Sequence, residues 1–182
     1  MRVAVTGTPG TGKTTATELL ASRSSDSGAD DDSHPDLEVI HLNRVLEDDG
    51  LYTEVDTDRD SKVADLAAIG EWLEGRDEVV IESHLAHHFD ADRVAVLRCR
   101  PETLEERLLE RGETAAKARE NAESEALDVI LSEAVDEHGL ESVYEIDTTD
   151  REPAAVADEL AAVAAGERDP SAGDVDFVGY LT

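Results

Sequence analysis

GTPGTGKTT, from Gly7 to Thr15, is the most informative segment of this chain. It fits the pattern G-x-x-x-x-G-K-[ST] without a mismatch, with Gly7, Gly12, Lys13 and Thr14 at the required places. In loops of this pattern the backbone N–H groups converge on a phosphate, while the lysine contacts the phosphates and the threonine hydroxyl binds Mg²⁺. The segment therefore predicts a phosphate-binding loop, called the phosphate loop below.

The residues on either side of the phosphate loop agree with this interpretation. Residues 2–6 (RVAVT) form a short β-branched run that predicts a buried strand, and residues 14–22 carry alanine and leucine at helical spacing. Strand, glycine loop and helix in this order are the setting that the motif requires. The alternative, a glycine-rich turn that matches the pattern by chance, is disfavoured by this agreement.

Apolar runs alternate with helical stretches along the rest of the chain. We predict strands at 3–6, 39–42, 79–82, 94–98 and 142–146, and helices at 13–23, 43–49, 60–74, 101–111, 115–137 and 153–165. Continuous apolar strands separated by helices indicate a parallel sheet that is covered on both faces. We expect a three-layer α/β fold with about five parallel strands, in one domain over residues 1–165.

Two segments stand apart from this predicted domain. Residues 22–35 (SRSSDSGADDDSHP) are polar and acidic and predict a flexible surface insertion, with a docking site for a basic peptide as the alternative. Residues 166–182 form a C-terminal tail that ends in DFVGYLT. Because Phe177, Tyr180 and Leu181 are bulky, we expect this end to dock onto the domain; a hook for a partner protein is the alternative.

The chain is strongly acidic, with 45 Asp and Glu against 16 Lys and Arg, a net charge of −29 and three lysines. Such a surface repels itself at ordinary ionic strength, but at about 1 M salt the Debye length shrinks to about 3 Å. The charge is spread over every segment, which indicates adaptation to a salt-rich cytoplasm such as that of a haloarchaeon. Direct binding to nucleic acid is disfavoured because the phosphate backbone would be repelled.

The single cysteine, Cys99, excludes a disulfide within the chain and favours a reducing compartment. No apolar run approaches the roughly 20 residues that span a bilayer, and no targeting pattern precedes the first predicted strand. We therefore expect a cytoplasmic protein without a membrane partner.

The third predicted strand ends in VVIESH, residues 79–84. In phosphate-loop enzymes a carboxylate at the end of the neighbouring strand holds Mg²⁺, often through water, and Glu82 occupies that position. His84 follows two residues later and would point to the same side, where its imidazole could orient a water or a second phosphate. The alternative for Glu82 is a strand-end carboxylate bonded to backbone amides.

His84, His87 and His88 lie close together in sequence, but they lack a cysteine or a second ligand set nearby. A transition-metal site is therefore disfavoured, and we expect His87 and His88 in a loop or at a helix start.

Arg107 and Arg111 lie one helical turn apart, just before Gly112 ends the predicted helix. Arginines beside a glycine hinge commonly clamp a triphosphate and stack on a base. The alternative is that both arginines are solvated and paired with neighbouring glutamates.

The phosphate loop, the ESH of residues 82–84, LRCRPETLEERLLERG at 97–112 and the spacing of Lys117, Asn121 and Glu125 together resemble one family. They are similar to the atypical adenylate kinases, the archaeal relatives of the coilin-interacting nuclear ATPase protein. The resemblance implies an adenylate-kinase-like fold with a monophosphate-binding segment at about 39–61 and a short lid at about 110–120.

The resemblance also implies roles for individual residues. The ATP phosphates would be bound by Gly10, Gly12, Lys13, Thr14 and Thr15, with Arg111 touching ATP, Thr14 and Glu82 holding Mg²⁺, and Lys13, Glu82, His84 and Arg111 forming the catalytic set. Three departures from the family stand out: Glu82 replaces a common aspartate, residues 22–35 are longer than the usual link, and residues 39–61 match loosely, with Arg44 as their one good phosphate ligand.

The activity implied by the resemblance is phosphoryl transfer from Mg·ATP to AMP or a related nucleoside monophosphate, together with ATP hydrolysis. The family also implies a role in small ribosomal subunit maturation (16S rRNA processing), with a platform ribosomal protein as partner. One alternative is an assembly factor whose ATP turnover gates release from that ribosomal protein. Another is a kinase of a different small molecule, for which no acceptor-specific constellation is visible.

Overall fold

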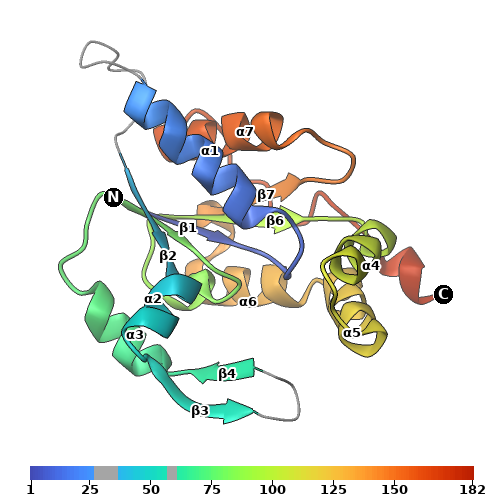
Figure 1. Cartoon of the computed structure of the whole chain (residues 1–182). Coiled ribbons are helices and arrows are strands. Elements are labelled where there is room, and N and C mark those ends of the chain that lie inside the picture. Colours follow the sequence, from blue (N-terminus) through green and yellow to red (C-terminus); the bar gives the residue numbers. More distant parts are fainter. Residues whose placement is uncertain (27–36, 57–60) are drawn as a thin grey trace.

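The structure, a computed structural model, describes residues 1–26, 37–56 and 61–182. Its centre is a five-stranded parallel sheet in the order β2-β5-β1-β6-β7 (Figure 1). These strands are β1 (Arg2–Thr6), β2 (Glu38–His41), β5 (Val79–Glu82), β6 (Arg93–Arg98) and β7 (Val143–Asp147). The predicted three-layer α/β fold is confirmed, and the predicted first residue of each strand is within one residue of the observed one.

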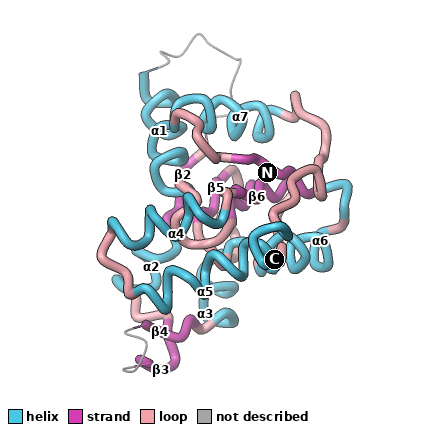
Figure 2. The backbone as a smooth tube through the Cα atoms, turned by 90° about the vertical axis from the view of Figure 1, so that its right-hand side faces the viewer, coloured by secondary structure: helices cyan, strands magenta, loops and turns pink. Residues whose placement is uncertain are grey.

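Helices cover both faces of the sheet (Figures 1 and 2). The helices are α1 (Lys13–Asp26) and α7 (Pro153–Ala165) on one face, α2 (Leu42–Asp48), α3 (Leu66–Leu73) and α6 (Val129–His138) on the other, and α4 (Pro101–Glu110) with α5 (Ala115–Ala126) beyond the carboxyl end of β6. Three short 3₁₀ helices are η1 (Ala86–His88), η2 (Leu140–Ser142) and η3 (Val178–Leu181). Within the described ranges, none of these helices has the length and apolarity needed to span a bilayer.

Alternation along the strands divides the core into two layers. Val3 and Val5 pack with α1 and α7, whereas Ala4 between them packs with α2, α3 and α6. The same alternation recurs in β5, where Val80 faces the first layer and Ile81 the second. Both faces are thus apolar and buried, which explains why the strands read as continuous apolar runs.

The prediction of one helix over 60–74 is wrong in its first part. β3 (Tyr52–Asp56) and β4 (Ser61–Ala64) form an antiparallel hairpin instead. Asp65 then starts α3, because its side chain accepts a hydrogen bond of 3.0 Å from the backbone N–H of Ala68.

The prediction of one helix over 115–137 is also wrong, because a turn divides this range into two helices, α5 and α6. Asp128 adopts a left-handed conformation with φ of 54°, and its carboxylate lies 2.5 Å from a guanidinium nitrogen of Arg98. At the other end of the chain, α1 continues past the predicted end at 23 to Asp26. The rest of the predicted insertion, from 27 onward, lies outside the described residues.

The C-terminal tail docks onto the domain, as its bulky residues predict. The Tyr180 hydroxyl donates a 2.9 Å hydrogen bond to Glu105 of α4, and η3 lies against α5. Further up the tail, the backbone N–H groups of 173–175 donate to one carboxylate oxygen of Glu145 at 2.8 to 3.1 Å. The tail therefore packs against β7.

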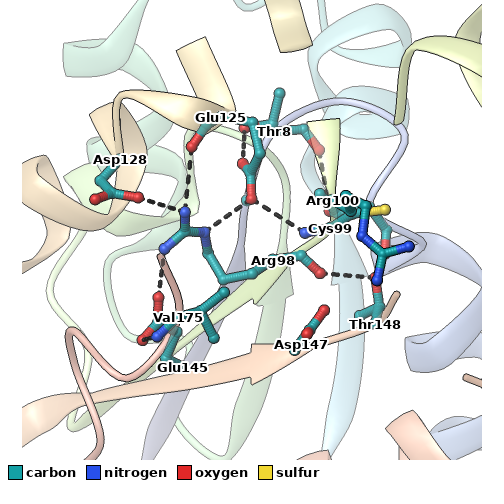
Figure 3. A network of polar contacts seen from close by, with 12 residues as sticks. Thr8, Arg98, Cys99, Arg100, Glu125, Asp128, Glu145, Asp147, Thr148 and Val175 are labelled. Atoms are coloured by element: carbon teal, nitrogen blue, oxygen red, sulfur yellow. Dashed lines mark hydrogen bonds and ion pairs between the residues drawn. The ribbon is translucent and has the colours of Figure 1, made fainter. Parts of the chain in front are cut away.

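A buried guanidinium connects these elements (Figure 3). The side chain of Arg98, 1% exposed, donates from Nε to Glu125 at 2.8 Å and forms ion pairs with Glu145 and Asp128. Glu125 in turn accepts from the hydroxyl of Thr8 at 2.5 Å and from the backbone N–H of Cys99 at 3.1 Å. One cation thus links β6, β7, α5 and the phosphate loop.

Replacing Arg98 with methionine should lower the free energy of unfolding by about 3–5 kcal/mol, because buried carboxylates would lose their cation. Urea denaturation in molar KCl measures this loss. Arg100→Met is the matched control, since the Arg100–Asp150 pair is 3.4 Å long and more than half exposed on both sides, and it should cost at most about 1 kcal/mol. Equal losses in the two variants would contradict a structural role for the buried network.

Candidate active site

The phosphate loop connects β1 to α1 and is shaped by close backbone contacts. Gly7 has a φ of 139°, and a Cβ there would lie 2.3 Å from the carbonyl oxygen of Leu97. Gly10 has a φ of 94°, and its Cβ would lie 2.9 Å from a methyl group of Leu104. The Thr148 hydroxyl, at the end of β7, donates to the loop carbonyl of Thr11 at 2.9 Å. A side chain at Gly7 would therefore displace the loop from β6, and one at Gly10 would displace it from α4.

Lys13, the first residue of α1, folds back over the loop. Its Nζ donates to the carbonyl oxygens of Gly7 and Thr8 at 2.8 and 3.1 Å, and the residue is buried. Burial lowers the pKa of Lys13 to about 8, against the opposing charges of Glu82 and Glu125. The amine is therefore held where the phosphate loop would receive a phosphate group.

Glu82 lies beside the loop because β5 pairs with β1 and β2. The sheet register aligns Glu82 with Val5 on one side and with His41 on the other. One carboxylate oxygen of Glu82 accepts from the Thr14 hydroxyl at 3.3 Å, and the other lies 2.8 Å from Nδ1 of His41. In the part of the chain that the structure describes, both partners of this carboxylate are side chains and not backbone amides. A hydroxyl next to a carboxylate is the oxygen ligand set that Mg²⁺ prefers.

His84 is partly buried two residues after β5. Burial lowers its pKa to about 4, and the charges of Lys13, His87 and His88 act in the same direction. Within the described part of the chain, the ring nitrogens of His84 form no hydrogen bond, whereas its carbonyl accepts from Thr6 at 3.3 Å. A neutral ring with open nitrogens near Lys13 can bind a polar atom of a ligand.

A cavity of about 270 Å³ opens from the phosphate loop toward α7. Its lining combines loop backbone, three arginines and apolar groups, namely Gly10, Thr11, Gly12, Thr15, Ala16, Arg107, Arg111, Thr148, Arg151, Pro153 and Val156. Arg107 donates to the sulfur of Cys99 at 3.4 Å, and in the described ranges neither Arg107 nor Arg111 is paired with a glutamate. Arg151 is ion-paired with Glu159 at 2.5 Å, so the positive charge beside the loop is that of Arg107 and Arg111, in a chain whose net charge is −29.

The structure brings most of the predicted site residues together around the loop. Lys13, Thr14 and Glu82 meet at its mouth, while Gly10, Gly12, Thr15 and Arg111 line the cavity. Arg44 instead forms an exposed ion pair with Glu18 of α1 at 2.9 Å. Sequence reasoning missed His41 and Arg151; the signal for His41 was a polar residue at a strand end, as for Glu82.

A parallel sheet of this order, a glycine loop bent against it and a buried lysine at the start of α1 define a phosphate-loop protein. A protein-family model described as AAA domain matches residues 3–128. The protein named "Putative adenylate kinase" from Natronomonas pharaonis is 60% identical over the whole of both chains, and its namesake from Halobacterium salinarum is 54% identical over the same extent. The chain belongs to the family of these archaeal proteins.

More distant relatives show the same family and fold. The protein of the same name from Methanocaldococcus jannaschii is 37% identical over 88% of this chain and 84% of its own. Among solved structures, a shikimate kinase from Bacteroides thetaiotaomicron has a TM-score of 0.55 at 18% identity, covering 88% of this chain and 95% of its own. A gluconokinase from Sinorhizobium meliloti has a TM-score of 0.53 at 20% identity, covering 91% and 92%. These two show the fold.

Binding of ATP should be coupled to proton uptake by Lys13. Below pH 8 the amine is already charged, whereas above pH 8 it is largely neutral and the phosphates would draw a proton back onto it. At pH 8 we expect an uptake of about half a proton and an affinity that falls as the pH rises further. Calorimetry in buffers of different ionisation enthalpy measures the uptake. Lys62→Met, outside the cavity, should preserve the uptake. If the unmodified protein took up no proton, the assignment of Lys13 as the phosphate-binding amine would be contradicted.

Proposed function

We propose that this protein is a nucleoside monophosphate kinase that transfers the γ-phosphate of Mg·ATP to AMP or a related monophosphate. The observation that carries the proposal is the meeting of Lys13, the Thr14–Glu82 pair and an arginine-lined cavity at one phosphate loop. The names of the archaeal relatives support the same reaction.

In this proposal ATP lies along the loop. The loop N–H groups and Lys13 bind the β- and γ-phosphates, and the nucleoside occupies the cavity between the arginines of α4 and the start of α7. Thr14 and Glu82 hold Mg²⁺, and His41 orients the Glu82 carboxylate by its 2.8 Å contact. The chemistry that Mg²⁺ would supply there is positive charge that offsets the negative charge developing on the phosphates.

The remaining residues position the second substrate and exclude water. Arg111 is exposed beside Gly112, in the turn between α4 and α5. We place the short lid at about 110–120, where it would bring Arg111 over the donor. The neutral ring of His84 orients the acceptor phosphate or a water. The acceptor segment is proposed for 39–61, which includes α2 and β3.

We also infer ATP hydrolysis at the same site, because Thr14 and Thr15 are exposed and water reaches the loop. The finer proposal of small ribosomal subunit maturation, with a platform ribosomal protein as partner, rests on the resemblance to the coilin-interacting ATPase family. If that partner is physiological, adding it should raise ATP hydrolysis or shorten the lifetime of the complex. The acidic composition and the haloarchaeal relatives further support activity at molar salt.

A panel of nucleoside monophosphates with ATP and Mg²⁺ in molar KCl tests the main proposal. We expect diphosphate to form fastest with AMP or a close relative, in excess over free phosphate. Lys13→Ala should reduce this turnover by a factor of about 10² or more with the circular dichroism spectrum unchanged. Arg76→Ala, which removes a cation stacked on Trp72 outside the proposed site, should keep most of the activity. If every acceptor gave only free phosphate and no diphosphate, the protein would be an ATPase, and the proposed kinase activity would be refuted.

His84→Ala should slow phosphoryl transfer by about ten- to a hundredfold and leave ATP affinity nearly unchanged, because the ring contacts the acceptor side. Single-turnover kinetics and ATP titration separate the two quantities. His84→Asn, which keeps a polar side chain, should retain more activity than the alanine variant. A loss of affinity without a loss of rate would exclude the role given to His84.

A further inference from the structure

A second cluster of ligand-type side chains lies between η1 and α6, on the face of the sheet opposite α1. Nε2 of His87 lies 3.1 Å from a carboxylate oxygen of Glu133, and Nδ1 of His88 lies 2.7 Å from one of Glu137. The two rings are 4.1 Å apart at their centres. One ligand atom each from His87, His88 and Glu133 lies within 4.8 Å of the others.

The inner half of this cluster is rigidly built. The His87 side chain is 1% exposed, and its Nδ1 lies 2.9 Å from the hydroxyl of Thr6, the last residue of β1. The His87 carbonyl lies 2.6 Å from Nε2 of His138, at the end of α6. The ring therefore cannot turn away from Glu133 without losing its contact to Thr6.

The hydrogen bonding of His87 also suits a metal ligand. The Thr6 hydroxyl donates to the carbonyl oxygen of His84 at 3.3 Å, so its oxygen can accept a hydrogen bond from Nδ1 of His87. In the tautomer with the proton on Nδ1, that nitrogen donates to Thr6 and Nε2 presents a lone pair toward the Glu133 carboxylate. At 3.1 Å this lone pair and the carboxylate oxygen repel each other unless Nε2 carries a second proton or both atoms bind a cation. A ring nitrogen fixed by an outer hydrogen bond is how metal-binding histidines are usually oriented.

The outer half of the cluster can adapt. Ligand atoms about 2.1 Å from a tetrahedral ion are about 3.4 Å apart, so the observed 4.8 Å limit requires a modest contraction. Glu133 and Glu137 have side chains 48% and 41% exposed and lie one turn apart on α6, so rotation about their side-chain bonds suffices. Solvent also reaches this side of the cluster, which gives an ion a path of entry.

We propose that His87, His88 and Glu133, with Glu137 as a further carboxylate, bind a divalent transition metal such as Zn²⁺. Imidazole and carboxylate together suit Zn²⁺, Co²⁺ and Ni²⁺, whereas Mg²⁺ prefers the all-oxygen set at Thr14 and Glu82. The bound ion joins η1 to α6 and, through the His87–Thr6 contact, supports the residue that precedes the phosphate loop. The sequence disfavoured a metal at these histidines because no second ligand set lies nearby in the chain. The fold supplies that set, since α6 brings Glu133 to His87.

Cobalt titration of the full-length, chelator-treated protein tests the site. In molar KCl with excess Mg²⁺, we expect about one equivalent of Co²⁺ to produce a visible absorption band that Zn²⁺ abolishes. The double variant His88→Gln/Glu133→Gln, which spares the buried His87, should weaken this binding at least about tenfold. Asp136→Asn on the same helix is the matched control and should bind Co²⁺ as the unmodified protein does.

A second readout distinguishes this site from the nucleotide site. Zn²⁺ should raise the unfolding temperature of the unmodified protein and of His41→Gln, but not that of the double variant. Absence of Co²⁺ binding in the unmodified protein, or equal binding in the double variant, would overturn the proposal and leave two hydrogen-bonded His–Glu pairs. Loss of all Co²⁺ binding in His41→Gln would overturn the proposal as well, because it would place the ion at His41 and its neighbour Glu82.

Discussion

The buried contact between Arg98 and Glu125 is the interaction on which the arrangement of this molecule depends. Glu125 belongs to α5 and Arg98 to β6, yet the same carboxylate also accepts the hydroxyl proton of Thr8 in the phosphate loop. Burying charges costs free energy that an apolar core would not lose, so the network is better understood as a device for register than for stability. It sets α5, the end of β6 and the loop at one mutual position.

Two cations, Lys13 and Arg98, are buried, whereas the other described lysine and arginine side chains are at least partly exposed. Arg98 lies in the core, Lys13 is buried in the loop, and three arginines line the adjacent cavity. Carboxylates compensate the charges of Arg98 and Arg151. The positive charge offered to a ligand is therefore that of Lys13, Arg107 and Arg111, in a chain with 16 basic residues and opposite net charge. An anionic ligand is thereby attracted to one place, and screening by salt weakens the surface repulsion more than the contacts in this partly enclosed cavity.

The strands, the sheet and the loop were predictable because each rests on a local pattern. Apolar runs identify the strands. The glycines and Lys13 identify the loop, and the loop in turn predicts which residue types lie beside it. The break at Asp128 was not predictable in the same way, because its left-handed conformation is stabilised by Arg98, 30 residues away. The hairpin of β3 and β4 was missed because its alternation is short and rich in charged residues.

The unpredicted parts of the two sites share one cause. His41 reaches Glu82 only because β2 pairs with β5, and Glu133 reaches His87 only because α6 packs over η1. Partners of this kind are separated by 41 and 46 residues, so no spacing rule connects them. The order of the strands supplies the information that the local sequence lacks.

The position of Lys13 has a consequence for the protein between turnovers. Its ammonium group caps two carbonyl oxygens of the loop, which would otherwise face one another with their partial negative charges unopposed. The side chain thus serves as an internal counter-ion for these carbonyls and supports the bend of the loop. In the proposed reaction the ammonium group would only have to turn from the carbonyls to the phosphates, so the loop would not have to refold each time a nucleotide arrives or leaves.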